Sequence, residues 1–378
     1  MTPDDELIFG SPESAVEIEE TSTDSLMEKP FNPNDIRIDN RPLTIDLLIK
    51  RLKADPIEID MQPAFQRKRD LWDQRKQSQL IESLLIKFPL PAFYFDGSDN
   101  DCWLVVDGLQ RLSSLQNFIV NKTLKLKGLE FLQKLEGKGY DDLPRNLQRQ
   151  IEEAQIVVYL INPGTPDEVK FNIFKRINTG GLMLNSQEIR QALNQGIPAQ
   201  FVTNLAESDS FKEATSYKID SPRMMDREFV TRFLAFYCYG YQNYIPDLDT
   251  FLNNAMRGLK NLSEQERDKI KQDFNSAMWL AKDVFGGYAF RKLDDFPRKK
   301  PFNKALFEVL SVLFAKLNED DRESIRSNGT DLMAAMENLM KNDQSFLGSI
   351  TVSTGSRANV NERFSKMSSI INEILSKC

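Results

Sequence analysis

Histidine is absent from all 378 residues of the sequence. Without an imidazole, the chain cannot supply an HNH nuclease site, a histidine-bound zinc ion, a Ser-His-Asp triad or an imidazole general base. Any chemistry must therefore rest on carboxylates, lysine, arginine, glutamine, hydroxyl groups, cysteine, backbone amides or a hard metal ion.

Cysteines and long apolar runs are scarce as well. Cys102, Cys238 and Cys378 are odd in number and widely spaced, which favours neither a disulfide framework nor a zinc site. Nowhere do about 18 apolar residues follow one another, as a membrane helix requires. The N-terminus carries Asp and Glu where a secretory signal needs Lys or Arg and an apolar stretch. We therefore expect a cytoplasmic protein in a reducing compartment, with no membrane partner.

Positive charge is scarce in one segment. Residues 1–29 hold nine acids and a single lysine, so this segment carries −8 while the whole chain carries −7, which leaves the remainder at +1. A near-neutral body argues against a strongly electrostatic DNA binder, which would need a basic domain. The strongest local basic cluster is Arg291-Lys292 with Arg298-Lys299-Lys300, which would contact either phosphates or only solvent.

The pattern of apolar residues predicts an α+β protein with three parts: an acidic disordered tail over 1–35, an α/β domain over 36–222 and an all-helical domain over 223–378. In the α/β part we expect helices over 45–52, from 73 to 88, and over 112–120, 166–177 and 185–196. We expect strands near 57, 92–95, 102–106 and 155–161. In the second part we expect helices at 226–240, 247–261, 263–285, 302–317, 330–341 and 359–376.

The segment VVDGLQR at 105–111 is the first candidate site. A strand, a glycine turn and a helix start together favour an anion, because the first helical amides are unpaired and the dipole end is positive. Arg111 would lie unfavourably in the first helical turn unless it has a phosphate or carboxylate partner. Asp107 could hold Mg²⁺ or a ribose hydroxyl, and Gln110 could orient water or a base. The alternative is an ordinary Asp-Gly turn with Arg111 in a surface ion pair.

A second Gln-Arg pair, Gln66-Arg67, lies in a turn ahead of Trp72. It is similar to Gln110-Arg111, because each pair stands beside a predicted helix start. The two pairs could converge on one polyphosphate, although the spacing alone does not bring them together.

The third candidate is the end of the helix that closes with FKRINTGG at 174–181. Glycine after a helix is an ordinary C-cap, and a cation there suits the helix dipole. The functional alternative is that Arg176 and Asn178 face a ligand, with Gly180 and Gly181 allowing the backbone to approach it.

Taken together, four blocks of sequence resemble, in order and spacing, the N-terminal domain family of GmrSD-type restriction endonucleases, within the ParB/sulfiredoxin-like superfamily. The blocks are PAFQR-x4-W at 63–72, LIESLL with PLPAFYF at 80–95, VVDGLQRLSSL at 105–115 and FNIFKRINTGG at 171–181. The resemblance covers about residues 40–200. It implies a ParB-like α/β nucleotide-binding domain followed by a helical companion.

The resemblance also implies site residues, because the family's DGQQR motif binds and hydrolyses nucleoside triphosphate. Carried over, the catalytic residues are Asp107, Gln110, Arg111 and Gln66, the nucleotide-binding residues are Gly108, Arg67, Arg176 and Asn178, and the Mg²⁺ ligand is Asp107. Leu109 departs from the motif, which has glutamine there. If that glutamine positions the attacking water, turnover is weakened here and binding alone survives.

The nuclease that accompanies many relatives is a second departure, because an HNH module needs histidine. The string PDEVK at 166–170 superficially matches the PD-(D/E)xK signature, but its residues open a single helix, whereas that site draws its acids from separate strands. Any cutting of DNA therefore needs another active site or a partner subunit, such as a nuclease of the same defence system.

Three functions follow as hypotheses. The first is an NTP-binding and NTP-hydrolysing component, with Mg²⁺, of a DNA-targeting restriction or antiviral defence system, without a P-loop because GxxxxGK[ST] does not occur. The second is a ParB-like DNA-binding or nicking protein. The third is a protein-interaction module with a vestigial pocket, which Leu109 would permit.

Overall fold

The computed structural model describes residues 15–17, 19, 32, 35–61, 72–99, 101–177, 184–219 and 223–377. The chain divides into two compact units, one of residues 31–193 and one of residues 1–30 with 194–378. The sequence pattern placed this division at residue 222. The helices between 194 and 222 belong to the second unit because they pack on its central helices.

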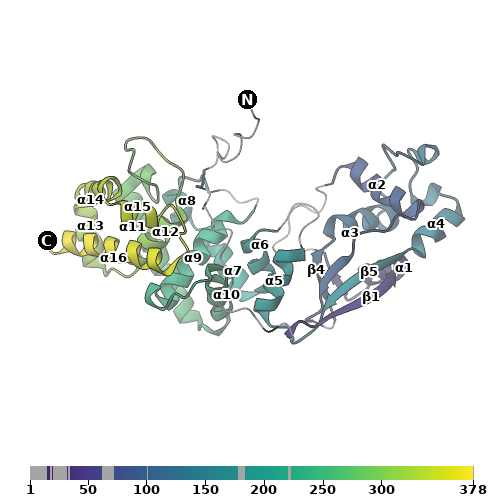
Figure 1. Ribbon diagram of the computed structural model, residues 1–378, viewed down its shortest axis with the longest axis horizontal. Helices are drawn as coiled ribbons and strands as arrows, with labels where there is room; N and C mark the ends of the chain where they lie inside the picture. The colour runs from purple at the N-terminus through teal and green to yellow at the C-terminus, as the bar shows by residue number, and fades with distance from the viewer. Residues whose placement is uncertain are drawn as a thin grey trace, which may run out of the picture. The chain divides into compact units, whose positions relative to one another are not determined.

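A five-stranded mixed sheet forms the frame of the first unit, in the order β1-β5-β3-β4-β2 (Figure 1). β1 pairs antiparallel with β5, β5 parallel with β3, β3 antiparallel with β4, and β4 parallel with β2. The strands expected near 92–95 and 102–106 are therefore confirmed as β3 and β4, which pair with each other. The strands are β1 (Ile38–Thr44), β2 (Ile59–Asp60), β3 (Phe93–Asp96), β4 (Trp103–Asp107) and β5 (Gln155–Ile161).

The helices α1 to α4 share one apolar core with the sheet. Thr44 and Asp73 cap the first two of these helices by accepting backbone N–H groups, as expected for such residues. Apolar side chains from the helices and from alternate strand positions, Phe93 and Phe95 among them, form a continuous buried cluster. The helices of this unit are α1 (Ile45–Leu52), α2 (Gln74–Leu85), α3 (Leu109–Leu115), continued by a π-helical segment (Gln116–Val120), α4 (Arg145–Glu152), α5 (Asp167–Ile177) and α6 (Ser186–Leu193).

Among the residues that the structure describes, the second unit is helical apart from its connecting segments and isolated bridge residues at Val16, Arg291, Phe302 and Val352. Aromatic side chains of α9 lie in its core, since Phe229, Phe233 and Phe236 have no exposed surface. Its helices are α7 (Ile197–Ala206), α8 (Asp209–Ala214), α9 (Met225–Tyr239), α10 (Leu248–Gly258), α11 (Glu264–Phe285), α12 (Lys304–Ala315), α13 (Glu319–Ser327), α14 (Gly329–Asn342), α15 (Gln344–Ser349) and α16 (Arg357–Leu375).

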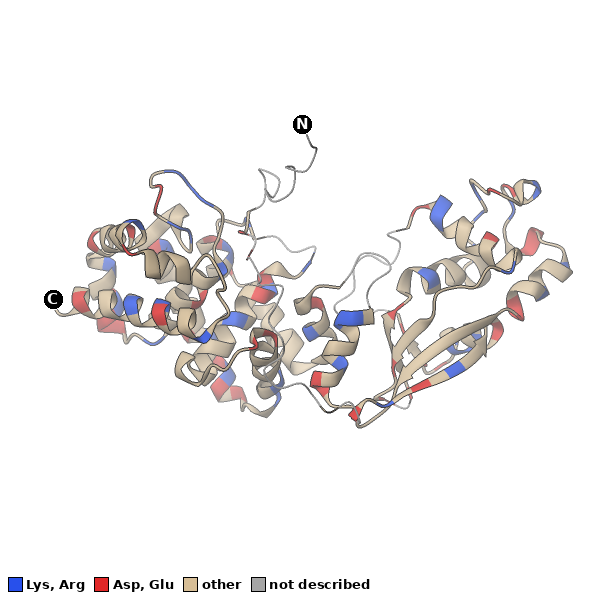
Figure 2. Ribbon diagram, viewed as in Figure 1, with Lys and Arg blue, Asp and Glu red and all other residues tan. Residues whose placement is uncertain are grey.

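Basic and acidic residues are interspersed along the helices of both units (Figure 2). Within the described residues, no helix has the length and apolar character needed to cross a membrane.

Candidate functional site

A single glycine turns the end of β4 directly into α3. Gly108 has a φ of +104°, and a Cβ atom at this position would lie 2.5 Å from Cδ1 of Phe93. Only glycine combines this left-handed backbone with such a close approach to a buried ring. The predicted Asp-Gly turn is therefore present, and it sets Asp107 beside the first turn of α3.

Arg111 folds back from α3 onto the end of β4. Its Nη2 donates to Oδ2 of Asp107 at 2.5 Å, and its Nη1 donates to the carbonyl oxygens of Ala92, at 3.1 Å, and of Pro91. The guanidinium carbon lies 4.6 Å from the centre of the Phe93 ring. A carboxylate partner within the chain thus accounts for a cation in the first helical turn. The arginine of this ion pair is buried rather than on the surface, because Arg111 is 8% exposed.

The two members of this ion pair differ in their access to solvent. Burial raises the pKa of Asp107, and the attraction of Arg111 and the Gly108 amide offsets this only in part. Burial lowers the pKa of Arg111, against the attraction of Asp107. The Asp107 side chain keeps 27% of its surface exposed, compared with 10% for Arg111. Asp107 is therefore the member that a ligand can reach, and Arg111 holds it in place.

Gln110 faces the chain that enters α2. Its Oε1 accepts a hydrogen bond from the backbone N–H of Trp72 at 3.2 Å, and Gln77 of α2 donates to the Trp72 carbonyl at 2.8 Å. These bonds hold the start of α2 against α3. Gln66 and Arg67 lie outside the described residues, so the meeting of the two Gln-Arg pairs stays a prediction. Trp72, which follows them closely in sequence, does lie against Gln110.

The third candidate segment is described only in part. Arg176 is exposed in the last turn of α5. Within the described part of the chain, no hydrogen bond or ion pair joins it to the turn at 107–111. Asn178, like Gly180 and Gly181, lies outside the described residues. The structure thus brings together the predicted residues of the turn itself, and the roles of the others stay predictions.

Sequence reasoning missed a buried ion pair that ties α5 to the sheet. Nζ of Lys170 lies 3.3 Å from Oδ2 of Asp96 at the end of β3, and each side chain is only 9% exposed. Lys170 also donates to the hydroxyl of Ser98. Lys170 is the last residue of the string PDEVK. Because its ammonium group contacts Asp96 and Ser98, this lysine attaches the helix to the sheet. The available signal was a lysine between two apolar residues on the buried face of α5.

Two tyrosines beside the turn were also missed. Tyr94 pairs with Asp107 in the β3–β4 ladder, so the two are close neighbours across the strands. The Tyr94 ring stacks on Tyr159 of β5 with 4.9 Å between the ring centres. Burial, and then the proximity of Tyr159 and Asp107, raises the pKa of Tyr94. A half-buried aromatic surface therefore adjoins the accessible carboxylate. Its presence depends on strand register, which the alternating pattern does not specify.

The fit of this site to Mg²⁺ rests on one carboxylate. Among the described residues, no three Cys, Asp or Glu side chains gather into a group that could hold a metal ion. Mg²⁺ on a polyphosphate is commonly bound by one or two protein carboxylates, with water and phosphate oxygens completing its shell. Asp107 has the exposure and the oxygen chemistry for that role.

Comparison with known proteins adds one match. Residues 48–194 match the family described as GmrSD restriction endonuclease, N-terminal domain. The resemblance read from the four sequence blocks is confirmed, and the match ends where the sheet-containing unit ends. No curated protein and no solved structure matches the chain. The similarity associates the sheet-containing unit with restriction endonucleases, and the helical unit lies outside it.

Proposed function

We propose that this chain, whose sheet-containing unit is of the GmrSD N-terminal type, is the nucleotide-binding component of a DNA-targeting restriction or defence system. The observation that carries the proposal is the Asp107–Arg111 ion pair at the glycine turn. It lies within the matched residues, at the motif through which the resemblance implies nucleotide binding. The pair holds an accessible carboxylate rigidly at the end of a strand, as a metal–phosphate ligand requires.

Each residue of the turn has a distinct task in this proposal. Asp107 supplies a carboxylate oxygen to Mg²⁺, which when bound would neutralise phosphate charge. Arg111 acts as a positioning residue for Asp107, through the contacts that also hold it to the 91–92 carbonyls. Gly108 forms the left-handed turn that places this carboxylate, because the Phe93 ring fills the space that a Cβ would need. Gln110 orients water or the ligand.

The stacked rings of Tyr94 and Tyr159 give a further part of the site. A nucleobase can stack on the outer face of such a pair whatever its identity, because every base has a π-face. We assign this pair to the base of the nucleotide. Gln66 remains a proposed water-orienting residue, and the proposed phosphate ligands outside the turn are Arg67, Arg176 and Asn178.

The departure at Leu109 favours binding over rapid hydrolysis. Leu109 packs against the apolar core of the sheet-containing unit, so its side chain serves the fold and offers no polar group to a water molecule. We therefore propose slow turnover, with the bound nucleotide acting as a regulatory signal. Cleavage of DNA would then come from a partner subunit, since no HNH site is available in a chain without histidine.

Thermal unfolding in the presence of nucleotides tests this proposal. The full chain is heated with ATP, GTP, CTP or a deoxynucleotide and Mg²⁺, alongside Asp107→Asn and the control Asp141→Asn, an exposed acid of the same unit. A ligand at about 100 times its Kd adds roughly 2.7 kcal/mol to the stability of the folded state. In a unit of this size that raises the Tm by about 5–10 °C.

The expected result is a nucleotide-specific shift in the wild type and in Asp141→Asn that is lost in Asp107→Asn, each measured against the variant's own ligand-free transition. A Tm shift that is equal in all three proteins would show that the nucleotide binds elsewhere than at the turn. If no nucleotide shifts the Tm and duplex DNA binds with a salt-sensitive affinity that depends on Arg111, the turn is a DNA-binding site instead.

A further inference from the structure

Part of the acidic N-terminal segment lies on the helical unit as a short extended strand. The backbone N–H of Glu17 donates to the carbonyl of Phe302 at 2.8 Å, and the N–H of Phe302 donates to the carbonyl of Ala15 at 2.9 Å. Val16 lies between Ala15 and Glu17 in sequence. Its side chain is 9% exposed and belongs to the large apolar core. The contact thus has the backbone pairing and the side-chain anchor of an added strand.

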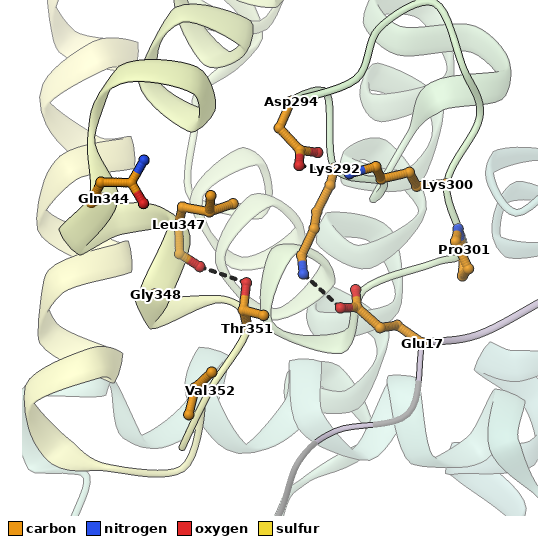
Figure 3. Close-up of a pocket in the computed structure, with 10 residues that line it drawn as sticks. All are labelled: Glu17, Lys292, Asp294, Lys300, Pro301, Gln344, Leu347, Gly348, Thr351 and Val352. Carbon is orange, nitrogen blue, oxygen red and sulfur yellow. Dashed lines mark hydrogen bonds and ion pairs between the residues drawn. The ribbon is translucent and has the colours of Figure 1, made fainter. Parts of the chain in front are cut away.

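The carboxylate of Glu17 has two donors on the helical unit. Nζ of Lys292 lies 2.5 Å from Oε1, and Nδ2 of Asn303 donates to Oε2 at 2.9 Å. Figure 3 shows the Glu17–Lys292 contact at the edge of an open pocket of about 520 Å³. Lys292 is 6% exposed, so the predicted basic cluster is not an open patch at this residue.

Glu19, two residues further along, meets a second and more deeply buried group. Its Oε2 lies 2.5 Å from Nη2 of Arg232, and its Oε1 accepts from Nη1 of Arg232 at 3.1 Å and from the hydroxyl of Thr354 at 2.9 Å. Nζ of Lys304 is 3.7 Å away. Burial alone would raise the pKa of Glu19, but the attraction of Arg232 and Lys304 outweighs it and lowers the pKa.

The helical unit without this segment has an excess of buried positive charge. Among the described residues of the helical unit, three cations, Arg232 included, face two acids. The cations are Arg232, Lys304 and Arg363, and the acids are Glu228 and Glu308. Glu19 brings the group to neutrality, and Glu17 does the same for Lys292. A buried charge without a partner is strongly destabilising, so this face requires two carboxylates from an extended chain.

We propose that this face of the helical unit is a binding site for an extended acidic peptide with two carboxylates two residues apart. The chain's own residues 15–17 and Glu19 are the resident ligand, and the acidic strand of a partner protein is the ligand that replaces them. Residues two apart in an extended strand project to the same side, which matches the spacing of Glu17 and Glu19. The pocket beside Glu17, lined also by Gln344 and Val352, gives an incoming peptide further room.

A nicked full-length protein tests the proposal. A protease recognition sequence is inserted among residues 21–30, the N-terminus is labelled with a fluorophore, and the chain is cut after folding. Binding of the labelled fragment to the body is then followed by anisotropy and gel filtration. Unlabelled synthetic peptide of residues 11–24 is added in excess as the competitor.

Two peptide variants of equal net charge separate specific recognition from general electrostatics. One carries Glu17→Gln with Glu19→Gln, and the other carries Glu13→Gln with Asp24→Asn. We expect the cut fragment to stay bound, to exchange with the wild-type and control peptides, and to resist the Glu17/Glu19 variant, which should bind roughly tenfold or more weakly.

Four results would overturn the proposal. Immediate loss of the fragment after cutting would show that no binding site exists, and equal competition by both peptide variants would show that the two carboxylates are not recognised. A bound fragment that no peptide displaces would make the segment a fixed part of the fold. Displacement by duplex DNA at concentrations at which the peptide also works would show a general anion site rather than a peptide site.

Discussion

Replacing Gly108 with alanine perturbs the glycine turn in a way whose magnitude can be worked out. A left-handed backbone costs an L-residue about 1–2 kcal/mol. The new Cβ would also lie 2.5 Å from the ring of Phe93, and inserting a methyl group into a packed core costs about 1–3 kcal/mol more. Gly137 is a matched control, because its φ is +77° but a Cβ there would meet nothing within 4 Å. We expect Gly108→Ala to be the more destabilising by about 1–3 kcal/mol.

Urea unfolding followed by tryptophan fluorescence measures this difference. Of the three tryptophans, Trp72 and Trp103 belong to the sheet-containing unit, so a Trp279→Phe background makes the signal report on that unit alone. Gly108→Ala should cost less unfolding free energy in a Phe93→Leu background than in the wild type, because the two residues that collide are coupled. Equal destabilisation at Gly108 and Gly137 would refute the close packing of the turn.

Three further predictions concern the same unit. Lys170→Met leaves the buried Asp96 carboxylate without its ion-pair partner and should lower the free energy of unfolding by about 3–5 kcal/mol in urea titrations. The double variant with Asp96→Asn should recover part of this stability, and no recovery would contradict the pairing. Glu82→Gln should cost about 1.5–3 kcal/mol at pH 7, because the carboxylate accepts the N–H groups of residues 130–132. Although burial would raise the pKa of Glu82, these bonds lower it below 4.5. The stabilisation by Glu82 is therefore present above pH 4.5 and is lost as the pH falls through the lowered pKa. A difference in unfolding free energy between wild type and variant that persists in acid would refute this. Leu109→Gln should raise the rate of phosphate release from a bound nucleotide, and an unchanged or lower rate would refute the explanation of slow turnover.

Local patterns were sufficient to predict much of the fold. Asp73 before an amphipathic stretch predicted the start of α2, and the two aromatic runs around a polar turn predicted β3 and β4. Such features depend on neighbours in sequence, which capping and turn chemistry describe well. The Asp-Gly turn at the candidate site is of the same kind, and so the sequence located it correctly.

Features that depend on distant residues were beyond the sequence. β1 is a mostly exposed edge strand without an apolar alternation, and only its pairing with β5 defines it. The partner of Arg111 was left open, because nothing local shows that the 91–92 carbonyls lie beside it. The sequence also predicted a disordered tail up to residue 35, whereas residues 15–17 and 19 pack on the helical unit. Their composition is acidic, and the cations that bind them are more than 200 positions away.

Equilibrium dialysis of the full chain against each nucleoside triphosphate with Mg²⁺ tests the central claim most directly. We expect saturable binding of one nucleotide per chain, abolished by Asp107→Asn and retained by Asp141→Asn. Absence of saturable binding for every nucleotide, or binding that Asp107→Asn leaves unchanged, would contradict it.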